Sequence, residues 1–178
     1  MSLACLAGIA SADETVGICH GYGCEYQAQI RYTEGQLGEI RRMMFAATDA
    51  ATERFVLAVA IGRLYGWGGE QSDIHNDRGG NYADENVSGK MDCIDHSTST
   101  SRLLHLLVRR GYLRWHRVLE PEARHFAGIL PVHWSAVIEE TIDGELRRFA
   151  VDSWFVDNGH PAVILPLNEW KKGAGPDV

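Results

Sequence analysis

The stretch "MDCIDHSTSTSRLLHLLVRRGY", residues 91–112, holds the start, the apolar stripe and the end of a single helix. Asp92 is a favourable N-cap residue, and the leucines behind it recur at helical spacing. Gly111, which follows two arginines, is a natural C-terminal stop. The sequence therefore predicts a helix that begins at Asp92 or Cys93 and carries Cys93 in its first turn.

Cys93 has an acidic residue on each side, Asp92 and Asp95. Carboxylates oppose the ionisation that makes a thiol a nucleophile. The positive end of the helix dipole acts in the opposite direction, by on the order of 0.3–1 kcal/mol. Three interpretations are open: a nucleophile, a small buried residue, or a zinc ligand with His96 at C-x2-H spacing.

The bulk composition is that of an ordinary globular protein. The chain has 178 residues, 45% hydrophobic and 23% charged, with a formal net charge of −7. No basic run exceeds two residues, so nucleic acid and anionic membranes are disfavoured as partners. No segment reaches about 18 unbroken apolar residues, so no transmembrane segment is predicted. Composition does not define an oligomeric state.

The N-terminus, "MSLACLAGIASADET", has an apolar stretch followed by small residues, which resembles the end of a secretory signal peptide without its basic front. We expect residues 1–12 to be a signal-peptide remnant or a tag, or else a frayed apolar terminus. Residues 13–178 would then form one domain, in a periplasmic or secreted protein.

Cys19 and Cys24 enclose a Gly-rich turn, "GICHGYGCEY". In an oxidising compartment they would form a local disulfide. The alternative is a zinc site with His20, for which the sequence indicates no fourth ligand. Loss of Cys5 with the signal would leave Cys93 outside any disulfide.

From Gln36 to Tyr65 apolar residues recur at helical spacing, which predicts one long helix, or two with a break near Thr48. Residues 66–89 are rich in Gly, Asn and Asp. They are predicted to form a long loop, and long loops inside compact domains are usually functional.

Two strands are predicted around Asp143-Gly144, a strong signal for a two-residue hairpin turn. Residues 132–139 alternate ahead of the turn, and 146–156 form the return strand. This register places His133 and Asp152 on one face, diagonal to each other, whereas a three-residue loop would place them on opposite faces. With a further strand at 163–165, the plan is α+β.

Cys93, His133 and Asp152 are the parts of a thiol catalyst. The thiolate attacks a carbonyl carbon, an imidazole takes and returns the proton, and a carboxylate orients the imidazole. The alternatives without a chemical role are a buried cysteine, a core histidine and a strand-end aspartate.

Three segments, "MDCIDHSTSTSRLLHLLVRRGY", "PVHWSAVIEE" and "FAVDSWFVDNG", carry a resemblance to the transglutaminase-like superfamily, relatives of papain. Members have Cys, His and Asp in this order. The resemblance implies an α+β fold with N-terminal helices, in which the nucleophile starts a core helix packed on an antiparallel sheet. It also implies Cys93, His133 and Asp152 as the catalytic residues.

Asp-Cys-x-Asp further resembles bacterial transglutaminase-like cysteine proteinases of the periplasm, some of which bind calcium beside the nucleophile. That resemblance implies Asp92 and Asp95 as calcium ligands, and Asp73, Asp77 and Asp84 would add oxygens. The "SWFVDNG" continuation departs from that group. The chemistry itself requires no cofactor.

The expected function is that of an exported cysteine protease, a thiol hydrolase that cleaves amide bonds of a protein or peptide substrate. Three alternatives stand beside it: a transglutaminase or other acyltransferase with the same triad, a non-catalytic member that binds peptide or cell-wall material, and a metal-dependent structural module.

Overall fold

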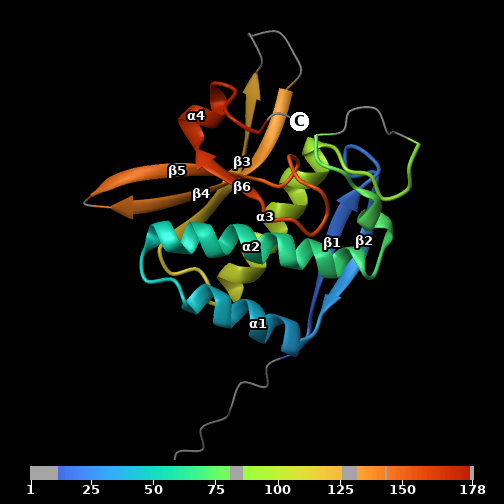
Figure 1. The fold of residues 1–178 in the computed structure, drawn as a ribbon, viewed down its shortest axis with the longest axis horizontal. Helices are drawn as coiled ribbons and strands as arrows, with labels where there is room; N and C mark the ends of the chain where they lie inside the picture. The colour runs from blue at the N-terminus through green and yellow to red at the C-terminus, as the bar shows by residue number, and fades with distance from the viewer. Residues whose placement is uncertain (1–11, 81–85, 126–131, 143, 177–178) are drawn as a thin grey trace, which may run out of the picture.

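The computed structural model describes residues 12–80, 86–125, 132–142 and 144–176 (Figure 1). Within these residues the chain forms four α-helices, one short 3-10 helix and two antiparallel sheets. The architecture is α+β, as predicted. The expected signal-peptide remnant, residues 1–12, lies outside the described residues except for Ala12.

The first sheet is an N-terminal hairpin of β1 (Glu14–His20) and β2 (Tyr26–Tyr32). Only its turn was anticipated from the sequence. Four consecutive turn residues have positive φ, from Gly21 at 87° through Tyr22 and Gly23 to Cys24 at 61°. This left-handed region is easy for glycine and costly for other residues. Contacts to the rest of the protein must therefore hold Tyr22 and Cys24.

The predicted helical region is two helices, α1 (Glu34–Phe45) and α2 (Ala50–Gly69). The break lies where it was expected, because Asp49 caps α2 in a capping box with Thr52. The predicted loop after Tyr65 was wrong at its start, since α2 continues to Gly69 and a 3-10 helix, η1 (Asp73–Asn76), follows. Burial of Trp67 in the core outweighs the poor helix propensity of the glycines around it.

Helix α3 (Cys93–Arg109) has the predicted bounds. Asp92 is its N-cap, and Gly111 follows it with a φ of 67°. Its buried leucines join the main core. Cys93 is consequently the first residue of a long, well-anchored helix.

The second sheet has the order β3-β4-β5-β6. Its strands, and the short helix that follows them, are β3 (His116–His125), β4 (Val132–Ile142), β5 (Glu145–Asp152), β6 (Val163–Pro166) and α4 (Leu167–Lys171). Ile142 pairs with Glu145, and Ala136 pairs with Val151, so the two-residue register is confirmed. Neither β3 nor α4 was predicted.

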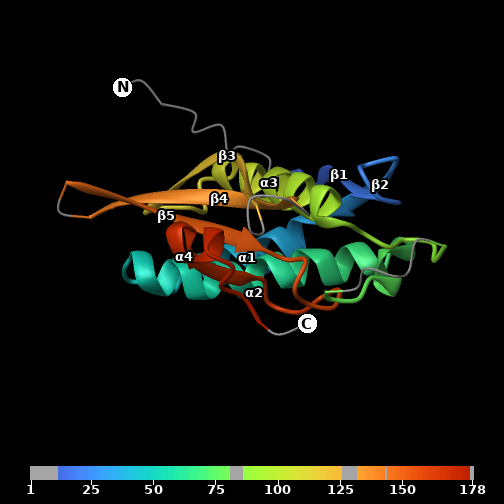
Figure 2. The same cartoon turned by 90° about the horizontal axis from the view of Figure 1, so that it is seen from above.

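Helix α3 lies between the β1–β2 hairpin and the four-stranded sheet. Helices α1 and α2 form a second layer, which covers one face of this assembly (Figures 1 and 2). Adjacent residues of β4 and β5 point to two cores. Ile138 and Phe149 face the main core, whereas Val137 and Ala150 face a smaller one that also contains Trp170 and contacts Cys93. None of the helices in the described part of the chain has the length and apolar character needed to span a bilayer.

Candidate active site

His133 and Asp152 form a direct pair across β4 and β5. Their side chains are on the face of the sheet that carries Val137 and Ala150, because residues two apart in a strand share a face. The Nε2 atom of His133 lies 2.7 Å from Oδ2 of Asp152. The two side chains thus bridge the diagonal distance between the strands that the register predicts.

Asp152 is a buried carboxylate with several donors. Its Oδ2 accepts a hydrogen bond from Nε1 of Trp170 at 2.8 Å, and its Oδ1 accepts one from the backbone N–H of Trp154 at 3.2 Å. Only 2% of the residue is exposed. Such a carboxylate has little freedom to rotate, so it fixes the ring that it contacts.

Aromatic rings surround His133. The centroid of its imidazole lies 4.9 Å from that of Trp154, 5.5 Å from Phe155 and 5.7 Å from Trp170. Burial among these rings acts to lower the pKa of His133, but hydrogen bonds with Asp152 and Cys93 outweigh it, so the pKa lies above the ordinary histidine value. The site therefore makes this imidazole a stronger base than an ordinary histidine.

Cys93 meets this pair from the N-terminus of α3. Its side chain is half-buried and packs against the smaller core, and its contact with His133 is one of the causes of the raised pKa. Since Asp152 occupies Nε2, Nδ1 is the ring nitrogen left to exchange a proton with the thiol. The three residues expected to act together are brought together.

Asp92 and Asp95 face the β1–β2 turn. Together they form the capping box of α3, and both also accept hydrogen bonds from backbone N–H groups of that turn. Calcium requires a shell of oxygen ligands, and N–H donors around both carboxylates do not fit that requirement. A calcium site at these two residues stays a prediction.

The remaining acids of the expected calcium set have separate partners. Oδ1 of Asp77 accepts from the backbone N–H of Met91, and Oδ2 of Asp73 accepts from the hydroxyl of Ser88. Asp84 lies outside the described residues. Among the described residues, the group with metal-like spacing is Cys19, Cys24 and Asp95, and its two sulfurs are joined in a disulfide.

His96 belongs to a buried network that the sequence did not reveal. Its Nε2 lies 3.0 Å from Oδ2 of Asp77, and its Nδ1 lies 2.8 Å from Oγ of Ser153. The Ser153 hydroxyl is 2.9 Å from that of Thr100 on α3. The network thus ties the helix of Cys93 to the residue that follows Asp152.

Two of these contacts, those of Trp170 and Asp77, have no signal in the sequence for the same reason. Trp170 lies in a five-residue helix near the C-terminus, and Asp77 follows η1, so neither has a local pattern that points to the triad. The sequence signal closest to them is the triplet Asp152-Ser153-Trp154, whose serine contacts His96.

A pocket of about 840 Å³ lies elsewhere, between α2, β5 and α4. Its lining includes Arg54, Arg148 and Lys171, which pair with glutamates. None of the triad residues lines it. The pocket is therefore separate from the cluster of Cys93, His133 and Asp152.

Comparison with known proteins adds no relative: neither a protein-family model, nor a curated protein, nor a solved structure matches this chain.

Proposed function

We propose that this chain is a thiol hydrolase of transglutaminase-like type that cleaves amide bonds in peptides. The observation that carries the proposal is the meeting of Cys93, His133 and Asp152 on three separate elements. A buried carboxylate behind an imidazole, with a helix-start thiol in front of it, is the arrangement that nucleophilic catalysis at a carbonyl carbon needs.

In the first half-reaction His133 takes the thiol proton, and the sulfur of Cys93 bonds to the amide carbon. The carbonyl electron pair moves onto oxygen. We assign the backbone N–H of Cys93 to that oxyanion, because first-turn N–H groups point out of a helix N-terminus. The imidazolium then gives its proton to the leaving nitrogen, and the C–N bond breaks.

In the second half-reaction His133 takes a proton from water, whose oxygen bonds to the thioester carbon. The C–S bond breaks, and the imidazolium returns a proton to sulfur. Asp152 holds the ring and stabilises its charged form throughout. An amine in place of water would give acyl transfer, so both outcomes share the thioester on Cys93.

The Cys19–Cys24 disulfide supports export. Disulfides persist in oxidising compartments such as the periplasm and the cell exterior. We infer a periplasmic or secreted location, consistent with the signal-like N-terminus.

The test is the rate at which iodoacetamide alkylates Cys93, followed by peptide mass spectrometry. We expect His133→Gln to slow this alkylation by about tenfold, because the thiolate loses its imidazolium partner. His125→Gln on the exposed end of β3 is the matched control and should react like the wild type. Equal rates in all three proteins would favour a non-catalytic peptide- or cell-wall-binding chain and contradict the proposal.

A further inference from the structure

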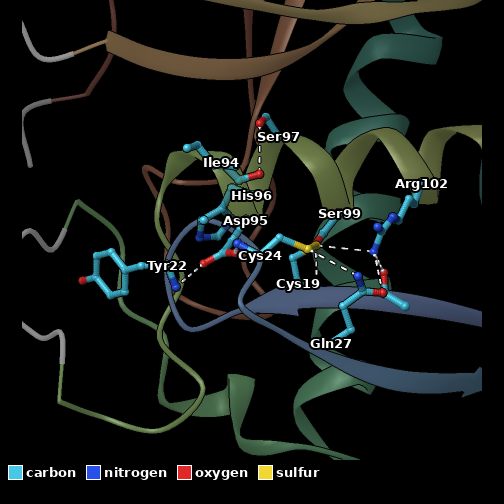
Figure 3. Close-up of a disulfide and its surroundings, with 12 residues drawn as sticks. Cys19, Tyr22, Cys24, Gln27, Ile94, Asp95, His96, Ser97, Ser99 and Arg102 are labelled. Carbon is cyan, nitrogen blue, oxygen red and sulfur yellow. Dashed lines mark hydrogen bonds between the residues drawn. A yellow bond between two sulfur atoms is a disulfide. The ribbon is translucent and has the colours of Figure 1, made fainter.

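The Cys19–Cys24 disulfide is docked on one face of α3 (Figure 3). The backbone N–H of Cys19 donates to Oγ of Ser99 at 2.8 Å. Nη1 of Arg102 lies 3.4 Å from Sγ of Cys19. Asp95, Ser99 and Arg102 recur at helical spacing, so a single stripe of α3 receives the disulfide and its turn.

The same turn donates hydrogen bonds to Asp92 and Asp95, the carboxylates on either side of Cys93. Three consecutive backbone N–H groups point at them. Tyr22 donates to Oδ2 of Asp95 at 2.8 Å, Gly23 to Oδ2 of Asp92 at 3.0 Å, and Cys24 to Oδ1 of Asp95 at 2.6 Å. A run of left-handed residues with converging N–H groups forms a concave anion-binding nest.

This nest has two effects on Cys93. It fixes the first turn of α3, because Asp92 and Asp95 are also the two members of the helix capping box. It also places the positive ends of three N–H dipoles against the two acids that oppose a thiolate at Cys93. These dipoles offset part of the negative charge with which Asp92 and Asp95 oppose ionisation of the Cys93 thiol.

The nest depends on the disulfide. Tyr22 and Cys24 hold left-handed backbone angles of 69° and 61°, which cost a non-glycine residue free energy. The covalent link between the ends of the turn restricts the alternatives open to it. Without the link, the turn can relax and release both carboxylates.

We propose that the Cys19–Cys24 disulfide is a redox-sensitive positioning element that keeps Cys93 reactive while it is oxidised and lowers that reactivity when it is reduced. The inference rests on the proposed function, since it concerns the same nucleophile. Asp92 and Asp95 act as positioning residues through which the disulfide reaches Cys93.

The reductant is a dithiol. Its thiolate attacks Sγ of Cys24, which is half-buried, whereas Cys19 is fully buried. The S–S bond breaks, and Cys19 leaves as a thiolate beside the guanidinium of Arg102, which favours its departure. The second thiol of the reductant then releases Cys24. Two electrons and two protons pass to the protein, and the dithiol becomes a cyclic disulfide.

Reduction also changes the charge beside the nest. A carboxylate oxygen of Asp95 and the sulfurs of Cys19 and Cys24 all lie within 4.8 Å of one another. A thiolate at either position would repel the Asp95 carboxylate. This repulsion acts in the same direction as the lost covalent link, toward release of the turn.

The experiment measures the rate of Cys93 alkylation by iodoacetamide in three preparations of wild-type protein: oxidised, reduced with dithiothreitol and desalted, and reduced then reoxidised. Peptide mass spectrometry separates Cys93 from Cys19 and Cys24. We expect about a tenfold lower rate after reduction and recovery on reoxidation. Far-ultraviolet circular dichroism of each preparation separates this change from a loss of structure, because the helical signal should stay constant through the series.

Two variants accompany the measurement. A Cys19→Ala/Cys24→Ala protein should have the low rate and no response to dithiothreitol. Arg102→Gln should slow the reduction of the disulfide by about threefold, because the departing thiolate loses a cation. If the double variant does not fold, the wild-type series gives the answer alone, with far-ultraviolet circular dichroism as its folding control.

An unchanged Cys93 rate in folded, reduced protein overturns this inference, and so does a reduced protein that has lost its helical signal. If the Cys93 alkylation rate depends on His133 but not on the disulfide, the proposed function stands and only the positioning role is contradicted. If the rate depends on the disulfide but not on His133, the positioning role stands and the triad is contradicted. A rate that depends on neither contradicts both the triad and the positioning role.

Discussion

Asp152 is the residue on which the geometry of the site converges. Its carboxylate receives His133, the indole N–H of Trp170 and the backbone N–H of Trp154. The imidazole is buried, and burial alone would favour its neutral form. The raised pKa of His133 is therefore due to its partners, Asp152 first and Cys93 second.

We expect Asp152→Asn to lower the pKa of His133, because the hydrogen bond and the negative charge that raise it are lost while burial remains. Titration of the imidazole by nuclear magnetic resonance measures this change. Asp157→Asn is the control, since Asp157 is a partly exposed carboxylate paired with Arg78. An unmoved His133 titration in Asp152→Asn would show that the pair does not set the charge of the ring.

The sequence was informative about these residues to different degrees. The hairpin turn and the period of two place His133 and Asp152 on one face, and the cap pattern places Cys93 at a helix start. Trp170 and His96 were beyond reach, because their contacts join segments distant in the chain. Side-chain packing decides such contacts, and no local pattern encodes it.

Helix α3 is the element that carries the nucleophile, and its N-cap does more than an ordinary cap. Asp49 and Asp92 both form capping boxes, on α2 and α3 respectively. Of these two N-cap residues, Asp92 also accepts a hydrogen bond from the hairpin turn, from the backbone N–H of Gly23. The start of α3 is consequently held by its own cap and by the β1–β2 hairpin.

Asp92→Ala should lower the free energy of unfolding by about 1–2 kcal/mol for the cap, and by roughly 1 kcal/mol more for the lost hydrogen bond to Gly23. Asp49→Ala removes a comparable cap without a hairpin contact and should cost only the first amount. Urea denaturation of both variants gives the comparison. A smaller loss in Asp92→Ala than in Asp49→Ala would contradict the anchoring of α3 by the hairpin.

At the scale of the whole molecule, two buried histidines link stability to pH. Burial acts to lower the pKa of His96, but the charge and hydrogen bond of Asp77 outweigh it, so its pKa is raised, as is that of His133. A raised folded-state pKa stabilises the fold below the unfolded value of about 6.5. This stabilisation is lost as the pH rises through the folded-state pKa.

We therefore expect the free energy of unfolding to fall as the pH rises above about 6.5 and through the raised pKa values of these two histidines, a range in which exposed carboxylates are ionised in both states. Burial and the charge of Asp92 raise the pKa of Asp95 to about 6, which has the same sign but acts at lower pH. His96→Gln should flatten this slope. Urea denaturation at several pH values measures it, and an unchanged slope in the variant would count against a charged His96.

The whole-molecule plan was only partly readable from the sequence. The α+β class, the α1–α2 break and the β4–β5 register were predicted, because caps, periodicity and turn residues are local signals. Strand β3 contains Pro121 and a bulge before Glu122, which obscure its alternation. The β1–β2 hairpin was read only as a turn, because its two short strands surround an unusual left-handed loop.

The most direct test of the triad is a single-turnover acylation with an activated ester, p-nitrophenyl acetate, read as a burst of p-nitrophenolate together with the mass of the Cys93 peptide. We expect an acetyl group on Cys93 and a burst rate that falls by about a hundredfold in His133→Gln. A burst without acetylated Cys93, or the same rate in wild type and His133→Gln, would contradict the account.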